Sequence, residues 1–231
     1  MKTTTQEDVL AKEGMARRSF LKFAGAGAIA AGVVATASSC QKHGGVVSDP
    51  TAIDLGTGDL AVLNYAYALE QLEAAFYTQV VSSPYANIST TERNFLTDIR
   101  DHEVAHREFF KTALGGNAIG ALTPNFSKIN FADRTSVLSY AKAFEDLGVA
   151  AYNGAGYLIK SADYLTLAGK IVSVEARHAA LIRLLLGIAI EEDTIVNVSG
   201  SGLELSQTPQ KVLDQANQFI SGKPLIAPNL M

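Results

Sequence analysis

Two stretches of the chain share one pattern: ALEQLEAAFY (residues 68–77) and AFEDLGVAAY (residues 143–152). Each places a glutamate, Glu70 or Glu145, in a largely apolar run, with a tyrosine seven residues later. A helix has about 3.6 residues per turn, so positions i and i+7 share one face and the acid lies on the buried side. A lone buried carboxylate is strongly unfavourable, so each acid needs a partner that balances its charge. The repeat therefore predicts a duplicated helix that carries a functional acid.

A second repeat follows each copy of the first. The segments HEVAH and VEARH contain Glu103 with His106 and Glu175 with His178, both in the pattern Glu-x-x-His. Positions i and i+3 of a helix lie about 60° apart around the axis, so the carboxylate and the imidazole point into the same space. The order along the chain is Glu, Glu-x-x-His, Glu, Glu-x-x-His, which indicates that the two halves are structural duplicates.

The six side chains of these repeats predict a metal site. Four carboxylates that converge in a bundle core would repel one another, and two divalent cations would offset their charge. Neutral imidazoles would complete the coordination. Carboxylate oxygen with imidazole nitrogen and no thiolate suits Fe or Mn, and could also take Zn. Glutamates from opposite helices can bridge two ions about 3.5–4 Å apart.

The rest of the chain predicts an all-α protein. Apolar residues make up 48% of the sequence and charged residues 18%, which excludes a disordered chain. Long tracts without proline favour long helices, and no segment alternates like a strand. Capping signals include Asp59, Ser89 followed by Glu92, and Gly115. We expect helices at about 59–81, 90–114, 133–160 and 164–190, and a short fifth helix from Pro209 to about Ile220.

The lengths of the connections predict the topology. Short first and third connections favour two antiparallel helical hairpins. The middle connection, residues 115–131, could extend about 55 Å, whereas a helix of this length spans about 35 Å. It can therefore cross the whole bundle, which gives a four-helix bundle with one long crossover.

These features resemble the ferritin-like superfamily. The stretches LEQLEAAFY and EDLGVAAYNGA are similar more narrowly to bacterial ferritin-like domain proteins related to plant desiccation-related proteins. The likeness covers about residues 55–190, and its specific part is the six-residue pattern. The resemblance implies a dimetal carboxylate site in which Glu103 and Glu175 bridge the ions. The implied metal ligands are Glu70, Glu103, His106, Glu145, Glu175 and His178.

The resemblance leaves the activity open. Bundles of this kind include iron oxidisers, peroxidases and manganese catalases, so we expect redox chemistry on Fe(II), oxygen or peroxide at a di-iron or di-manganese centre. The alternative is a non-enzymatic envelope stress protein, related to desiccation, in which the metal is structural or absent. A formal net charge of −4 offers no reason to expect a nucleic-acid partner.

One acid competes for the place of a ligand. Glu73 lies one turn from Glu70 on the same face. The internal repeat matches Glu70 with Glu145 but Glu73 with Gly148, which favours Glu70. Glu73 then remains either a neighbouring acid or an additional ligand.

Further expectations concern other residues near the site. Tyr77 and Tyr152 either hydrogen-bond the ligand carboxylates, or carry a radical, or only pack in the core. His102 is expected to point away from the site. Gly154 and Gly156 cost a helix about 1 kcal/mol each relative to alanine. They serve either close packing or a kink.

The N-terminus resembles an export signal. RRSFLK, with Arg17 and Arg18, matches the twin-arginine pattern, and ASSC resembles a lipoprotein cleavage box that would make Cys40 the lipidated first residue. An uncleaved membrane anchor or a simple secreted protein are the alternatives. We expect a periplasmic or membrane-anchored protein of the cell envelope. The expected layout is a signal at 1–40, a tether at 41–58, the bundle at 59–190, and a loop with the short helix at 191–231.

Overall fold

The structure is a computed structural model that describes residues 50–192 and 194–230. The expected export signal, Cys40 and most of the expected tether lie outside these residues. The described part contains four long helices and a shorter one. They are α2 (Gly58–Ser82), α3 (Thr90–Leu114), α4 (Arg134–Ala155), α5 (Ala162–Leu186) and α6 (Pro209–Ala216).

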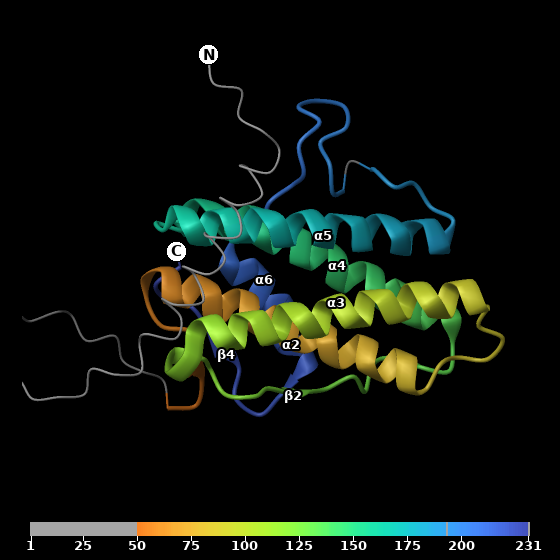
Figure 1. The fold of residues 1–231 in the computed structure, drawn as a ribbon, viewed down its shortest axis with the longest axis horizontal. Coiled ribbons are helices and arrows are strands. Elements are labelled where there is room, and N and C mark those ends of the chain that lie inside the picture. Colours follow the sequence, from red (N-terminus) through yellow and green to blue (C-terminus); the bar gives the residue numbers. More distant parts are fainter. Residues whose placement is uncertain (1–49, 193, 231) are drawn as a thin grey trace, which may run out of the picture. The chain divides into compact units, whose positions relative to one another are not determined.

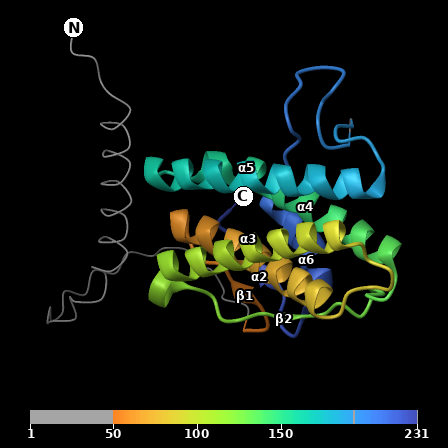
Figure 2. The same cartoon turned by 45° about the vertical axis from the view of Figure 1, so that its right-hand side comes forward.

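The long helices form two hairpins. Helix α2 packs most extensively against α3, and α4 against α5, and the members of each pair lie side by side in both views (Figures 1 and 2). The predicted all-α four-helix bundle with a long crossover and a short C-terminal helix is therefore confirmed. Within the described residues, no helix is both long and apolar enough to span a membrane.

Several helix ends follow the capping signals. The Ser89 hydroxyl accepts a hydrogen bond from the Glu92 backbone N–H, and Gly115 with φ 53° follows the last residue of α3. Asp133 caps α4 by accepting from the backbone N–H groups of Thr135 and Ser136. The two ends of α3 confirm the expected caps, and α4 begins where a helix was expected, although Asp133 was not predicted as its cap.

Other helix ends differ from the expectation. Asp59 does not cap its own helix: its carboxylate accepts from the backbone N–H groups of Lys160 and Ser161, at the start of α5. Helix α4 ends at Ala155 rather than Lys160, because the chain tightens into the 3-10 turn η2 (Gly156–Leu158). Helix α5 ends at Leu186 rather than Ile190, because Gly187 adopts a left-handed conformation with φ 69°.

The crossover between α3 and α4 runs along α2. It contains the 3-10 turn η1 (Gly115–Asn117) and strand β2 (Thr123–Pro124). Two polar side chains of α2 hold it: Asn64 accepts from the Ile119 N–H, and Gln71 from the Leu122 N–H, each at 2.9 Å. These bonds explain why two amides are buried in an otherwise apolar part of α2.

Two short strand pairs correct the expectation that the chain has no strands. Strand β1 (Ile53–Asp54) pairs in parallel with β4 (Leu225–Ile226), and β2 pairs antiparallel with β3 (Ile220–Ser221). Leu55, placed in the expected tether, is only 1% exposed and belongs to the core. The bundle therefore begins before residue 59. Two-residue strands are too short to produce an alternating pattern in the sequence.

Helix α2 is the centre of the bundle. Every residue from 61 to 74 is buried, because α3, α4 and the crossover cover its different sides. A helix that is surrounded in this way is apolar all round rather than on one face. Any acid in this segment is therefore enclosed by protein.

A buried ion pair joins α4 to the end of α5. The Arg183 side chain is 0% exposed, and both of its terminal nitrogens donate to the Asp146 carboxylate, with Nη2 2.6 Å from Oδ2. Lys142 lies 3.0 Å from the same carboxylate. Removing Asp146 would leave the fully buried Arg183 guanidinium without its main partner, so this pair stabilises the packing of α4 against α5.

The first prediction concerns the two glycines at the end of α4. A Cβ at Gly154 would lie 1.8 Å from the backbone oxygen of Gln207, whose N–H bonds to Ala150, whereas a Cβ at Gly156 meets nothing within 4 Å. We expect Gly154→Ala to lower the free energy of unfolding by about 2 kcal/mol or more, since backbone must move. Gly156→Ala, the matched control, should leave it unchanged or raise it by about 0.5 kcal/mol. Chemical denaturation measures both, and equal stabilities would contradict the close approach.

Candidate metal centre

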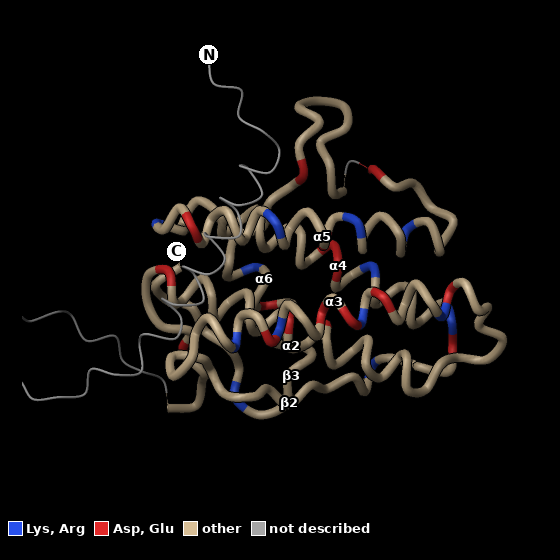
Figure 3. The backbone as a smooth tube through the Cα atoms, viewed as in Figure 1, with Lys and Arg blue, Asp and Glu red and all other residues tan. Residues whose placement is uncertain are grey.

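Acidic residues of neighbouring helices lie near mid-length of the bundle, as the red backbone positions in Figure 3 show. Glu70 comes from α2, Glu103 from α3, Glu145 from α4 and Glu175 from α5, and all four are 0% exposed. Each long helix thus contributes one carboxylate to the interior. The two histidines, His106 and His178, come from α3 and α5 and lie one turn after the glutamates of their own helices.

The six side chains predicted from the sequence come together in two overlapping groups. One group is Glu70, Glu103, His106 and Glu175, and the other is Glu103, Glu145, Glu175 and His178. In each group the candidate ligand atoms lie within 4.8 Å of one another. Each group combines one imidazole with three carboxylates.

Two carboxylates are shared by both groups. Glu175 places Oε1 2.8 Å from Nδ1 of His106 and Oε2 3.4 Å from Nδ1 of His178. Glu103 places Oε1 2.8 Å from Nδ1 of His178 and Oε2 3.8 Å from Nδ1 of His106. One oxygen of each carboxylate therefore faces each group, which is the arrangement expected of bridging glutamates.

The other two carboxylates each belong to one group. Glu70 Oε2 lies 3.4 Å from His106 Nδ1, and Glu145 Oε2 lies 3.6 Å from His178 Nδ1. The glutamate of α2 is thus terminal at one end of the site and that of α4 at the other. The site has the same internal duplication as the sequence.

Many of the buried polar atoms of the site have no hydrogen-bond partner. Among the described residues, both oxygens of Glu103 and of Glu175, one oxygen of Glu70 and of Glu145, and Nδ1 of both histidines are buried without a hydrogen-bond partner. These atoms lie within ion-pair distance of one another but converge on shared points instead of pairing. Buried polar atoms are rarely left in this state, so the set fits a positively charged occupant.

The carboxylates and imidazoles of the site shift one another's pKa values, and most of these shifts favour bound protons. Burial alone lowers the pKa of each imidazole, but the surrounding carboxylates outweigh it and raise the pKa of His106 and of His178 to about 12. Burial raises the pKa of Glu145 to about 8 and that of Glu70 well above its usual range. Both imidazoles are thus charged at neutral pH, and some of the acids are protonated.

Two tyrosines support the terminal glutamates in a crosswise manner. Tyr77 of α2 donates to Glu145 Oε1 of α4, and Tyr152 of α4 donates to Glu70 Oε1 of α2, each at 2.5 Å. Burial and the nearby carboxylates raise the pKa of both phenols, so both remain donors. Of the interpretations left open by the sequence, hydrogen bonding to the carboxylates is therefore confirmed.

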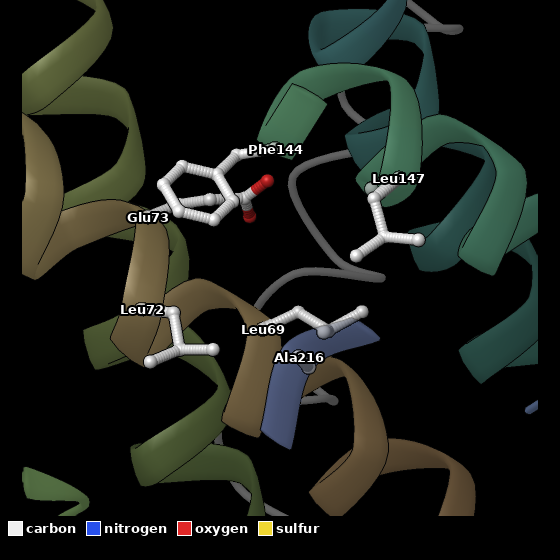
Figure 4. A pocket seen from close by; sticks show the side chains of 7 residues that line it. Leu69, Leu72, Glu73, Phe144, Leu147 and Ala216 are labelled. Atoms are coloured by element: carbon white, nitrogen blue, oxygen red, sulfur yellow. The ribbon is translucent and has the colours of Figure 1, made fainter. Parts of the chain in front are cut away.

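Glu73 is buried beside this site but belongs to neither group. Its Oε1 lies 3.0 Å from the position of a Cβ on Gly148, so the missing side chain of Gly148 makes room for the acid. Figure 4 shows its carboxyl group beside the Phe144 ring, at a small cavity also lined by Leu147. Burial, then the charges of the nearby glutamates, raise the pKa of Glu73 well above its usual range. Both causes favour the neutral form of this acid next to the site.

The prediction that His102 points away from the site is wrong. This exposed residue of α3 turns toward the site, and its Nδ1 lies 2.9 Å from Nε2 of His178. The sequence offered one signal that could have found it. His102 directly precedes a Glu-x-x-His motif, and a ligand histidine usually needs a partner for its second nitrogen.

A model of the ferritin-like domain matches residues 58–188, which is more than half of the chain. The chain belongs to the ferritin-like domain family. No curated protein matches it. The matched range spans the four long helices and contains all six candidate ligands.

The geometry of this ferritin-like domain is compatible with a dimetal carboxylate site. Two groups of one imidazole and three carboxylates, joined by two shared glutamates, offer oxygen and nitrogen donors for divalent metal ions. The charge of two divalent cations would balance four carboxylates. The donor set and the unpartnered atoms thus both fit a metal pair.

The second prediction is a pH dependence of the metal-free protein. The pKa of Glu145 is about 8 in the folded protein and 4.5 in the unfolded chain. Between these two pH values the folded protein keeps a proton that the unfolded chain has lost. The stability that Glu145 contributes is therefore complete below pH 4.5 and is lost as the pH rises to 8. The raised pKa values of the histidines act in the same direction above pH 6.5. We expect the free energy of unfolding to fall by at least about 1 kcal/mol from pH 5 to pH 8.

Thermal denaturation of the metal-free protein at the two pH values measures this effect. Glu145→Gln should reduce the pH dependence, whereas the exposed Glu108→Gln should not. A stability that rises from pH 5 to pH 8 would contradict the charge state described for the site.

Proposed function

We propose that this ferritin-like domain holds two divalent transition-metal ions, Fe or Mn, and carries out redox chemistry on Fe(II), oxygen or peroxide. The observation that carries the proposal is the pair of overlapping donor groups with unpartnered buried atoms. In this proposal the ligands are Glu70, Glu103, His106, Glu145, Glu175 and His178. When bound, the metal pair supplies the electrons and the Lewis acidity for the reaction.

The enclosure of the site favours a small reactant. All four glutamates are 0% exposed, and the His106 side chain, with 14% exposure, is the more open of the two imidazoles. Molecular oxygen, peroxide or an iron ion can reach such a site more readily than an organic substrate. This burial is why we favour these reactants.

The residues of the chain would control charge and protons in the reaction. Glu103 and Glu175 face both groups, so they can hold two positions together, while Glu70 and Glu145 each serve one end. Tyr77 and Tyr152 donate to the two terminal carboxylates and hold their orientation. The hydroxyl proton of each tyrosine also lies against Oε1 of its glutamate, close to the donor groups whose charge would change in the reaction.

A second function is favoured by the charge balance of the metal-free site. Two imidazolium groups and partly protonated acids can neutralise one another without metal. A non-enzymatic stress protein of the cell envelope, as the likeness to desiccation-related proteins suggests, could use the same bundle. In that case the metal would be structural or absent.

The third prediction separates these functions by metal content together with activity toward oxygen and peroxide. Protein isolated from cells should contain about two equivalents of Fe or Mn per chain, as in other dimetal bundles. The Glu103→Ala/His106→Ala variant should lose them, because it removes one bridge and one imidazole. Glu73→Gln, the matched control in the same interior, should keep them. Metal analysis with oxygen and peroxide assays measures the result, and a folded, metal-free wild type would favour the second function.

The fourth prediction concerns export. We propose that Arg17 and Arg18 direct the folded protein across the inner membrane and that Cys40 becomes the lipidated first residue. Replacing both arginines by lysine should leave most of the protein in the cytoplasm, and Cys40→Ala should release it from the membrane fraction. Cell fractionation and the mass of the mature N-terminus check both steps. An unchanged distribution in both variants would contradict the proposal.

A further inference from the structure

Besides the pairing of Glu73 with Gly148, the two halves of the site differ just before the shared glutamates. The residue before the bridging glutamate is His102 in α3 but Val174 in α5. His102 reaches across to His178 of the opposite hairpin. Val174 carries no polar group, so the equivalent position in the second half cannot form such a bond. The two histidines of the site therefore have different surroundings, although their motifs are the same.

The contact between His102 and His178 is an aligned hydrogen bond. The two nitrogens are 2.9 Å apart, the ring planes differ by 15°, and the ring centroids are 5.2 Å apart. This centroid separation is what the nitrogen–nitrogen distance and two ring radii give together. The rings therefore meet edge to edge in nearly one plane, which is the best direction for a hydrogen bond.

This bond determines how His178 presents its other nitrogen. Nδ1 of His178 faces the site, 2.8 Å from Glu103 and 3.4 Å from Glu175. A metal-binding imidazole offers the lone pair of one nitrogen and keeps its proton on the other. Nε2–H of His178 then donates to Nδ1 of His102, which selects the tautomer and restrains rotation of the ring.

His178, the histidine that is held by His102, is also the less exposed of the two imidazoles. The side chain of His178 is 5% exposed and that of His106 is 14% exposed. The end of the site that contains His178 is thus both better enclosed and better oriented. A ligand that is held in its binding orientation before the metal arrives loses less freedom on binding.

We propose that His102 is a positioning residue that orients His178 and makes the two metal positions unequal. The group of Glu103, Glu145, Glu175 and His178 binds its ion more tightly, and the group that contains His106 is the weaker and more open one. This inference rests on the proposed function, namely that the two groups hold metal. It goes further by assigning an order of filling and the residue that sets it.

Stepwise titration of the metal-free full chain with Zn²⁺, in competition with a chelator, tests the proposal. The wild type should show two different dissociation constants. His102→Ala should weaken the tighter site by about 10-fold or more, the usual effect of losing the partner of a ligand histidine, and leave the other unchanged. His102→Asn should restore most of the affinity, because its amide oxygen can accept the same hydrogen bond. Val174→Ala is the matched control and should change neither constant.

A second readout separates orientation from general loss of structure. Nitrogen-15 NMR of the zinc-loaded protein should show the proton of His178 on Nε2 in the wild type and in His102→Asn, and a changed Nε2 signal in His102→Ala. If His102→Ala changes neither the dissociation constant of the tighter site nor this signal, the proposed positioning role of His102 is wrong. The proposal that the two groups bind metal would not be affected. If the folded wild type binds no Zn²⁺, the proposed function fails, and the order of filling fails with it.

Discussion

The burial of four carboxylates at one point is the constraint on which this structure depends. Glu70, Glu103, Glu145 and Glu175 are all 0% exposed, so water cannot solvate their charge. The surrounding protein supplies two imidazoles that face three carboxylates each, and two phenols that donate to the terminal pair. A bundle built only for stability would gain more from apolar side chains at these positions. The arrangement is therefore best explained by what it can bind.

The duplicated topology brings these charges together, because each hairpin contributes the same set of side chains to the interior. Each hairpin supplies one glutamate that belongs to a single donor group, one glutamate shared by both groups and one histidine, and the tyrosines link the hairpins crosswise. Helix α2 carries its acid in the centre of the fold, where α3, α4 and the crossover surround it. The ion pair of Arg183 with Asp146, the residue after Glu145, holds α4 to α5 near the site. The departures from symmetry, His102 and the pairing of Glu73 with Gly148, lie directly beside the site.

Much of the fold and the convergence of the six side chains could be predicted because both depend on local periodicity. The spacing of Glu103 and His106, and the match of Glu70 with Glu145, need only the helical repeat. The cap at Ser89 also follows from a short-range hydrogen bond. Several predictions failed where a distant segment decided the outcome. Asp59 accepts hydrogen bonds from Lys160 and Ser161, just before α5, instead of capping its own helix, and Leu55 follows a strand that pairs in parallel with one near the C-terminus.

The four long helices, their order in two hairpins and the six candidate ligands could be read from the chain alone, since these follow from helix period and connection length. The packing of the helices was needed to show which glutamates are shared, which tyrosine bonds to which acid, and that His102 turns toward His178. All of these relations join different helices. Their distances depend on how the hairpins pack and rotate against each other, and no local pattern in the chain records that.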